Sequence, residues 1–374
     1  MKNLKAVRVS EHVYWVGAVD YNCRSFHGYS TPRGVTYNAY LIDGDEPILI
    51  DTVKAAFTQE MLARIADVVD PARIRHIISN HAEYDHSGAV AEVAKLSGAK
   101  VYASAAGIKA LTAMYGALDY VPLVSGQAVT LGGYSLTPYA TPMVHWPDNI
   151  VTLGKIDGKT MLFSNDAFGQ HFASSLHFDT QVDLHDVLME AKKYYANIVM
   201  PYAAQAAKAV AAAKSLSADI IAPSHGIIWT KHIHDIFALY EKMTAAEKVD
   251  KAVVVYDSMW GHTADAALTV GAQFEAKGCA TLYFDLKKND LSDIVTELLD
   301  AQYLAVGCPT FYGTILPTVA AFLAYLKALK PAGLQYMLFG SYGWGGGAIK
   351  ELDAALSAMG YTHIEDMPDS AEVY

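Results

Sequence analysis

Short apolar runs separated by Gly and Asp turns fill the first two thirds of the chain. Runs of β-branched and aromatic residues that end in turn residues are typical of strands. We expect strands over residues 35–42, 47–51, 74–79, 100–103, 127–131, 134–139, 150–153 and 160–163. Apolar residues three and four apart predict helices over residues 54–68, 88–96, 105–114, 182–195, 203–216 and 230–247. Strands that give way to helices in this manner indicate a layered domain of sheets and helices.

The pattern changes near residue 248 and becomes a strict alternation of strand and helix. We expect strands over residues 252–256, 280–285, 303–307 and 334–339, with a last one near 361–365. The helices between them are predicted over residues 264–277, 291–299, 318–329 and 348–359. Such alternation implies a parallel, doubly wound sheet. We therefore predict two domains, one over residues 1–248 and one over residues 249–374.

Composition supports two folded domains and limits the classes of partner that the chain is expected to bind. Of the 374 residues, 52% are hydrophobic and 18% are charged, so two large cores can be buried. The formal net charge is -11 and no cluster of Lys and Arg occurs, which argues against nucleic acid or an anionic membrane as a partner. The cysteines Cys23, Cys279 and Cys308 are far apart and form no C-x-x-C motif. This usage argues against a disulfide framework and against zinc or iron–sulfur sites made of cysteine, and it indicates the reducing cytoplasm.

One segment is long enough to cross a membrane, since residues 301–326 contain no charge. Pro309, Gly313 and Pro317 interrupt it, so we interpret it as a buried strand, a loop and a helix. The first 15 residues contain no continuous apolar stretch, and no secretory signal is expected.

The strongest chemical signal is a loop that carries His81, Glu83, Asp85 and His86 directly after the strand predicted over residues 74–79. All four side chains can bind a metal ion. A polar loop with helix-capping acids is the alternative, but a solvated loop rarely carries two His and two acids this closely. The sequence therefore predicts a metal site at the carboxyl end of this strand.

Three later residues extend the set, because His145, Asp166 and His225 each lie at a strand end. Taken singly, each has an ordinary explanation as a hydrogen-bonded core histidine or a capping aspartate. Together the chain offers three histidines and three carboxylates, with His86 in addition, which is too many ligands for one tetrahedral zinc ion. Two metal ions that share a carboxylate and a bridging oxo or hydroxo group fit better. Ligands without thiolate allow iron, manganese or zinc, and the dense carboxylates favour iron.

The second predicted domain carries three loops at the carboxyl ends of strands, where ligands bind in open α/β sheets. Residues 256–263 are rich in hydroxyls and open a helix, so they can hold a phosphate without Lys or Arg, although an ordinary helix cap is the alternative. The other two loops, 307–313 and 340–347, place Tyr312, Tyr342 and Trp344 beside glycines that let a flat ring approach. Neither a P-loop nor a G-x-G-x-x-G motif follows the first strand.

This arrangement of three loops resembles flavodoxin, whose ligand is FMN. The residues that the resemblance assigns to FMN are Ser258, Met259, Trp260, Gly261, His262, Thr263, Pro309, Thr310, Phe311, Tyr312, Gly313, Ser341, Tyr342, Gly343, Trp344 and Gly345.

The metal motif also resembles a known family. The run HAEYDH at residues 81–86 resembles the H-x-H-x-D-H signature of the metallo-β-lactamase fold, with Glu83 in place of the second histidine, and LIDT at 49–52 matches a strand motif of that fold. Glu83, with HWPD around His145 and SNDAFGQH around Asp166, resembles the flavodiiron proteins, and the spacing agrees. The resemblance covers essentially the whole chain. It implies α/β and α+β architecture, with an N-terminal metallo-β-lactamase-like αββα sandwich before a C-terminal flavodoxin-like doubly wound parallel sheet.

The resemblance implies a soluble oxidoreductase that reduces O2 to water, NO to N2O, or both, at a non-haem diiron site supplied with electrons through FMN. The iron ligands that it implies are His81, Glu83 and His145 at one iron, Asp85 and His225 at the other, and Asp166 between them. His86 matches a position that is either a ligand or turned away. His27, His171 and Tyr195 match positions near the diiron pocket and could donate hydrogen bonds or protons, although buried structural roles explain them almost as well.

The family also implies partners. FMN and a pair of irons can each store two electrons, which together meet the four-electron demand of O2. A head-to-tail homodimer, or a dimer of dimers, is expected, together with an external donor, for which rubredoxin is favoured and reduced deazaflavin coenzyme is the alternative. A zinc hydrolase of the lactamase fold and a metal-free electron carrier are the other functional classes, and Glu83, the flavin loops and the full ligand set argue against them. The family usually continues into a final helix, whereas this sequence stops at Tyr374.

Overall fold

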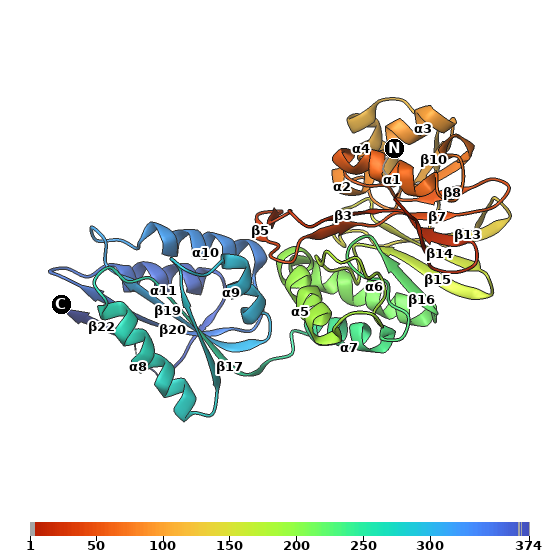
Figure 1. Ribbon diagram of the computed structural model, residues 1–374. Coiled ribbons are helices and arrows are strands. Elements are labelled where there is room, and N and C mark those ends of the chain that lie inside the picture. The colour runs from red at the N-terminus through yellow and green to blue at the C-terminus, as the bar shows by residue number, and fades with distance from the viewer. Residues whose placement is uncertain (1–3, 366, 368, 374) are drawn as a thin grey trace. The chain divides into compact units, whose positions relative to one another are not determined.

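The computed structural model describes residues 4–365, 367 and 369–373 (Figure 1). The chain divides into two compact units, which are described separately. Unit 1 comprises Met1–Phe26, Thr31–Tyr194 and Tyr202–Glu241, and unit 2 comprises His27–Ser30, Tyr195–Pro201 and Lys242–Tyr374. A helix with the length and apolarity of a membrane span does not occur among the described residues. The charge-free run over 301–326 folds instead as a strand and part of a helix, as expected.

Two sheets form the centre of unit 1. The first has the order β1-β2-β7-β8-β9-β10-β11 and the second the order β12-β13-β14-β15-β16. The strands of the first sheet are β1 (Val7–Arg8), β2 (Val13–Trp15), β7 (Tyr40–Ile42), β8 (Ile48–Ile50), β9 (His76–Ile78), β10 (Lys100–Ala103) and β11 (Tyr120–Pro122). Those of the second are β12 (Val129–Leu131), β13 (Tyr134–Ala140), β14 (Ile150–Ile156), β15 (Lys159–Asn165) and β16 (Ile220–Pro223). Outside these sheets lie the short strands β3 (Ala18–Asp20), β4 (Ser25–Phe26), β5 (Tyr29–Ser30) and β6 (Val35–Tyr37).

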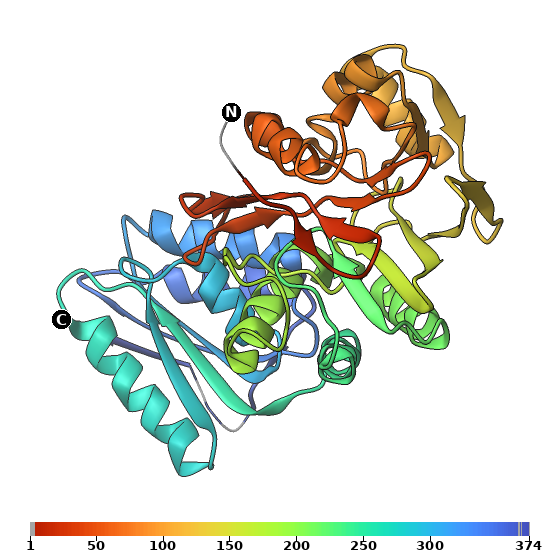
Figure 2. The ribbon, with the colours of Figure 1, turned by 45° about the vertical axis from the view of Figure 1, so that its right-hand side comes forward.

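Helices cover the outer faces of both sheets of unit 1 (Figure 1 and Figure 2). On one side lie α1 (Thr58–Ile65), α2 (Tyr84–Ser87), α3 (Val90–Ser97) and α4 (Ala105–Tyr115) with the turns η1 (Ala55–Phe57) and η2 (Pro71–Arg73), and on the other lie α5 (Leu184–Tyr194), α6 (Ala203–Ser215) and α7 (Ile233–Thr244). Tyr40 and Phe163 pack in the apolar layer between the sheets. Met61, Val93 and Leu111 pack between the first sheet and its helices. The αββα sandwich expected from the sequence is therefore confirmed.

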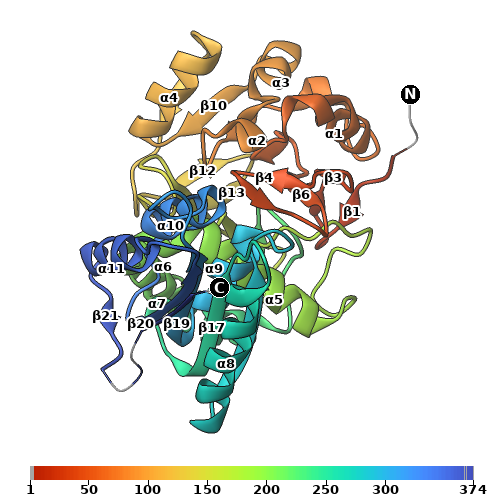
Figure 3. The same ribbon diagram turned by 90° about the vertical axis from the view of Figure 1, so that its left-hand side faces the viewer.

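Unit 2 is a parallel sheet with helices on both faces. The strand order β18-β17-β19-β20-β21, with β22 also paired to β20, follows the 2-1-3-4-5 order of flavodoxin-like sheets. The strands are β17 (Val249–Tyr256), β18 (Ala280–Asp285), β19 (Ala301–Pro309), β20 (Gln335–Tyr342), β21 (Thr362–His363) and β22 (Ser370–Val373). The helices are α8 (His262–Ala276), α9 (Leu291–Leu298), α10 (Pro317–Leu329) and α11 (Ala348–Ala358), and two short helical segments, η3 (Tyr195–Val199) and η4 (Met200–Tyr202), follow α5 in the chain. Phe274 of α8 packs on one face of the sheet, and Phe322 and Leu352 pack on the other. Figure 3 shows the helices α8, α10 and α11 that flank this sheet.

Three details differ from the expectations. The strand predicted over 35–42 divides into β6 and β7, and the short helix α2 precedes the helix expected to begin near Gly88. The last strand near 361–365 shrinks to the two residues of β21, and the unpredicted β22 pairs with β20 further along. Between them the Oδ1 atom of Asp369 accepts a hydrogen bond from the backbone N–H of Leu338 at 2.8 Å, so a side chain replaces one rung of the ladder.

Candidate metal centre and cofactor loops

The predicted metal-ligating side chains converge in unit 1. His81 follows β9, Asp166 follows β15 and His225 follows β16, so all three lie beyond the carboxyl ends of strands. Glu83 directly precedes α2, which carries Asp85 and His86. Even the most exposed of these side chains, those of Glu83 and His145, are only 11% exposed. The cluster is therefore shielded from bulk water.

A first group of ligand atoms gathers around Glu83. The Nε2 atoms of His81 and His145 each lie 3.2 Å from Oε2 of Glu83. The same two nitrogens lie 3.8 and 3.7 Å from Oδ2 of Asp166. Two ligands about 2.1 Å from one metal ion lie about 3.0 Å apart at a right angle and about 3.4 Å apart at the tetrahedral angle. These atoms thus have the spacing of ligands to a single ion.

A second group gathers around Asp85. Nε2 of His86 lies 3.4 Å from Oδ2 of Asp85 and 3.1 Å from Oδ1 of Asp166. Nε2 of His225 lies 3.1 Å from Oδ2 of Asp85 and 3.6 Å from Oδ1 of Asp166. Asp166 therefore presents one oxygen to each group, and His86, whose role the sequence left open, stands with Asp85 and His225.

Two of the three carboxylates in this cluster have no well-oriented hydrogen-bond donor, whereas Oε2 of Glu83 lies 3.2 Å from Nε2 of His81. Neither oxygen of Asp85 nor either oxygen of Asp166 accepts a hydrogen bond of acceptable geometry, although all four atoms are buried. Removing a carboxylate from water without such compensation costs several kcal/mol. Divalent cations would satisfy these oxygens and the facing imidazole nitrogens together. The donor set of nitrogen and carboxylate oxygen fits two such ions.

The pKa shifts of these side chains in the metal-free chain also fit a site for cations. Burial alone would raise the pKa of the Asp166 carboxyl, but the imidazoles of His86 and His81 hold it well below its usual range. Burial would likewise lower the pKa of His86, but the Asp85 and Asp166 carboxylates raise it to about 9. The raised pKa values of His81 and His86 thus favour protons on these two imidazoles without metal, and metal binding would release them.

Partners behind the ligands fix the imidazole rings. Nδ1 of His81 lies 3.0 Å from Oδ2 of Asp148, which also accepts the backbone N–H of Ala82 at 2.7 Å. Nδ1 of His225 lies 2.6 Å from the carbonyl oxygen of Thr36, which can only accept. Nδ1 of His225 therefore carries a proton, and Nε2 is the ring nitrogen that faces the cluster as a candidate metal ligand. The sequence reasoning did not single out Asp148 or Thr36; the position of Asp148 in the HWPD run was the available signal for it.

Of the residues predicted near the pocket, His171 lies beside the second group. Its ring centroid is 4.9 Å from that of His225 and 4.6 Å from that of Phe26. Tyr194, which the sequence reasoning did not name, packs 5.0 Å from His171. His27 and Tyr195 belong to the two short segments grouped with unit 2, and their roles beside a metal stay predictions.

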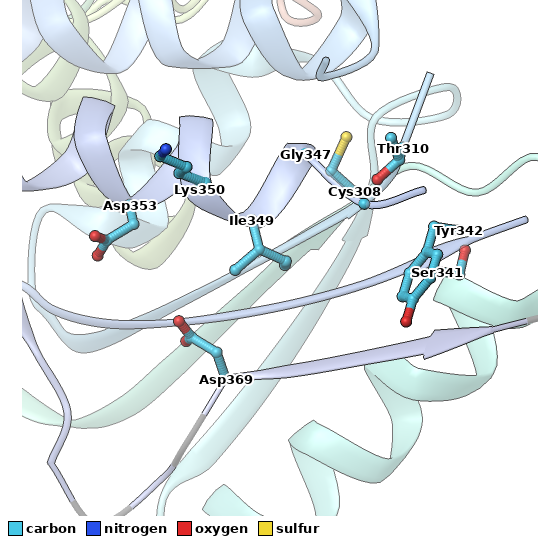
Figure 4. Close-up of a pocket in the computed structure, with 10 residues that line it drawn as sticks. Cys308, Thr310, Ser341, Tyr342, Gly347, Ile349, Lys350, Asp353 and Asp369 are labelled. Carbon is cyan, nitrogen blue, oxygen red and sulfur yellow. The ribbon is translucent and has the colours of Figure 1, made fainter. Parts of the chain in front are cut away.

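The predicted cofactor loops meet at the carboxyl end of the sheet in unit 2. They enclose a cavity of about 640 Å³ lined by Met259, Trp260, Thr310, Phe311, Tyr312, Gly313, Gly343, Trp344, Gly345 and Gly346. Trp260, Tyr312 and Trp344 are 79%, 88% and 94% exposed, so their rings are available to a flat ligand. Thr310, Ser341 and Tyr342 also line a smaller neighbouring cavity of about 350 Å³ (Figure 4).

The residues at the start of α8 form an environment suited to binding a phosphate group. Gly261 has φ 99, a left-handed conformation that suits glycine, and its N–H donates to Oγ of Ser258 at 3.0 Å. Oγ1 of Thr263 lies 2.8 Å from Oγ of Ser341, which links the first loop to the third. Lys287, which the sequence reasoning did not name, stands 2.9 Å from Oδ1 of Asp257 at the same loop. Hydroxyls, N–H groups and the helix dipole thus meet at one place, as an anion site requires.

Comparison with known proteins agrees with the two-domain fold. The chain matches the family model of the ODP family beta lactamase over residues 35–226 and that of flavodoxin over residues 254–370. It is 41% identical to a nitric oxide reductase of Moorella thermoacetica, with 94% of this chain and 90% of the relative covered. It is 37% identical to a rubredoxin-oxygen oxidoreductase of Megalodesulfovibrio gigas, with 98% and 91% covered. The crystal structure of the flavodiiron protein from Giardia intestinalis superposes with a TM-score of 0.95 at 31% identity and covers 100% of this chain and 92% of that one.

Proposed function

Because this chain belongs to the flavodiiron protein family, we propose that it reduces O2 to water, NO to N2O, or both, with electrons that pass through FMN. It is an oxidoreductase with a metallo-β-lactamase-like domain followed by a flavodoxin-like domain. The observation that carries the proposal is the pair of ligand groups that share Asp166, in one chain with a flavin-type cavity. When bound, the iron pair and FMN supply the electrons for the reduction.

We propose that the two ligand groups hold one iron each. The residues that would hold the metals are His81, Glu83 and His145 at the first iron, Asp85, His86 and His225 at the second, and Asp166 between them. Support comes from the spacing of their atoms and from the orphaned oxygens of Asp85 and Asp166. Three carboxylates and a bridging hydroxide would neutralise two divalent ions, which keeps the buried site close to electrical balance.

We propose that FMN occupies the cavity between the three loops of unit 2. Ser258, Thr263 and the first N–H groups of α8 would hold its phosphate, and the exposed rings of Trp260, Tyr312 and Trp344 would contact its flat ring system. Since the loop lacks a lysine or arginine of its own, the helix dipole carries more of the phosphate interaction.

Protons for the reaction are proposed to come from the polar residues near the second group. His171 packs against His225 and is buried, so it can donate to a bound oxygen species without opening the site to water. His27 and Tyr195 are proposed for the same role on the family resemblance.

Partners and compartment complete the proposal. The name of the Megalodesulfovibrio gigas relative supports a rubredoxin as external donor, and reduced deazaflavin coenzyme is the second candidate. We propose a head-to-tail homodimer, a domain boundary near residue 248 and a place in the cytoplasm, where the three free cysteines would stay reduced.

Elemental analysis of protein purified without added metal tests this function first. We expect about two irons per chain and one FMN, followed by O2 or NO consumption with reduced rubredoxin. A chain with two zinc ions that stays inactive after iron reconstitution would instead support the hydrolase alternative. That outcome would contradict the proposed redox function.

A further inference from the structure

Asn165 is a buried polar residue at the end of β15, directly before Asp166, and it is not a metal ligand. Its backbone is left-handed, with φ 54, a conformation that Asn tolerates better than most other residues with a side chain. The pairing of β15 with β16 shifts register between Phe163 and Asn165, so a bulge ends the strand here. Together the bulge and the left-handed residue set the direction in which the chain enters Asp166.

The side-chain amide of Asn165 joins three ligand loops. Its Oδ1 atom accepts a hydrogen bond from Nδ2 of Asn149 at 2.7 Å, and Oδ1 of Asn149 accepts the backbone N–H of Trp146 at 2.6 Å, next to His145. Its Nδ2 atom donates to Oγ of Ser224 at 3.4 Å, next to His225. Because an N–H can only donate, Asn149 must accept through Oδ1, and this fixes the orientation of both amides.

These bonds are part of a hydrogen-bonded layer of buried polar side chains, which continues to the first ligand group. Oγ of Ser224 donates to Oδ2 of Asp51 at 3.5 Å, and Asp51 accepts the backbone and side-chain N–H groups of Asn80 at 2.7 and 2.9 Å. Asn80 directly precedes His81. At the far end, Oγ1 of Thr152 donates to Oδ1 of Asn80 at 2.7 Å. All of these side chains are buried, so water does not compete for the bonds.

Asp166, like Asp85, lacks the kind of hydrogen-bond partner that orients the ligand histidines His81 and His225. His81 is held by Asp148 and His225 by the Thr36 carbonyl, whereas neither carboxylate oxygen of Asp166 accepts a hydrogen bond. Yet Asp166 is the ligand whose two oxygens face different groups, so a rotation that favours one group moves the other oxygen away. The side chains that face it within 4 Å are the imidazoles of the two ligand groups themselves, so its direction between them is set mainly by its backbone.

We propose that Asn165 is a positioning residue, whose left-handed backbone and shared amide fix the Asp166 carboxylate between the two ligand groups. This inference rests on the proposed two-metal centre. It assigns Asn165 no contact with metal or substrate, and it separates two contributions, the backbone conformation and the amide.

Three variants of the full chain test the two contributions. Asn165→Gly keeps access to the left-handed backbone but removes the amide, and Asn165→Ala removes both. Ser97→Ala is the control, because it removes a buried hydrogen bond of unit 1, from Oγ of Ser97 to the carbonyl oxygen of Val93, outside this layer. We expect iron affinity at the second ligand group to fall about 10- to 100-fold in Asn165→Gly, as for other partners behind metal ligands, and further in Asn165→Ala. Ser97→Ala should bind iron like the unaltered chain.

The readouts are iron per chain in chelator competition, FMN content and the EPR signal of the half-reduced iron pair. FMN content reports whether unit 2 is intact, and the EPR signal reports coupling through a shared carboxylate, which general destabilisation would not alter. If Asn165→Gly does not fold, Ser224→Ala removes the amide's acceptor instead and should change the EPR signal in the same direction. Wild-type iron affinity and EPR in Asn165→Gly would overturn the proposal. If the unaltered chain binds two zinc ions rather than iron, the proposed function fails, and the zinc affinities of the same variants still decide the role of Asn165.

Discussion

Asp148 is the side chain through which the orientation of the first ligand group can be tested most directly. Its Oδ2 atom accepts hydrogen bonds from both Nδ1 of His81 and the N–H of Ala82. Asp148→Ala removes both bonds and leaves the fully buried ring of His81 free to rotate or to change tautomer. Asp148→Asn can keep an oxygen in the same place and removes only the charge.

Two independent estimates give the size of the effect. Loss of a partner behind a metal-bound histidine weakens metal binding about 10- to 100-fold, which is about 1.4–2.8 kcal/mol. Burial would raise the pKa of Asp148, but the hydrogen bond from His81 lowers it, so the pair is held together by charge. A hydrogen bond to a charged group contributes about 1.5–3 kcal/mol, which is the same range. We expect iron affinity to fall by the upper end of this range, about 100-fold, in Asp148→Ala and by the lower end, about 10-fold, in Asp148→Asn.

The assay is anaerobic titration of Fe(II) against a chelator of known affinity. Asp235→Asn is the matched control, because Oδ2 of Asp235 lies 2.8 Å from Nδ1 of His232 in an Asp–His pair that belongs to no candidate metal group among the described residues. The control should bind iron normally. Iron affinity in Asp148→Ala equal to that of the control would refute the reasoning.

Three further predictions concern pH, stoichiometry and FMN. In the metal-free chain, the folded pKa of His86 is about 9 against about 6.5 unfolded, so its stabilising contribution is complete below about pH 6.5 and is lost as the pH rises through about 9. The melting temperature of the metal-free chain should fall across that window while the iron-loaded chain stays level, and a level metal-free profile would contradict this. His86→Ala should retain about one iron per chain by elemental analysis, whereas two would show that the second group does not need it. Thr263→Val should raise the Kd for FMN about 10- to 100-fold in a fluorescence titration, because a hydrogen bond to a charged group is lost. Thr269→Val, at an exposed position of the same helix, is the control, and a Kd in Thr263→Val no higher than that of the control would contradict the prediction.

Sequence reasoning found the proposed ligand residues, which the structure brings together, because strand ends can be recognised locally. His81, Asp166 and His225 each follow a short apolar run, and the carboxyl ends of neighbouring strands meet in space. The partners behind them are harder to find, since Asp148 reaches His81 across 67 positions of sequence and Thr36 reaches His225 across 189. Their roles depend on how the two sheets of unit 1 face each other, which no local pattern encodes.

His86 and β22 illustrate two other limits. The direction of the His86 side chain depends on the four-residue helix α2, which is too short to leave a periodic pattern. β22 exists because β20 offers it an unpaired edge, so its formation is a tertiary event rather than a propensity of residues 370–373.

The shared carboxylate of Asp166 has a consequence for how the site fills. If the two groups bind metal as proposed, an ion at either group would hold this side chain and restrict its rotamers before a second ion binds. Binding of the second ion would then order fewer side-chain rotamers and cost less conformational entropy, which gives positive cooperativity without any change of fold. Populations of chains with a single ion should therefore be small, and the protein should alternate between empty and doubly loaded forms as metal becomes available.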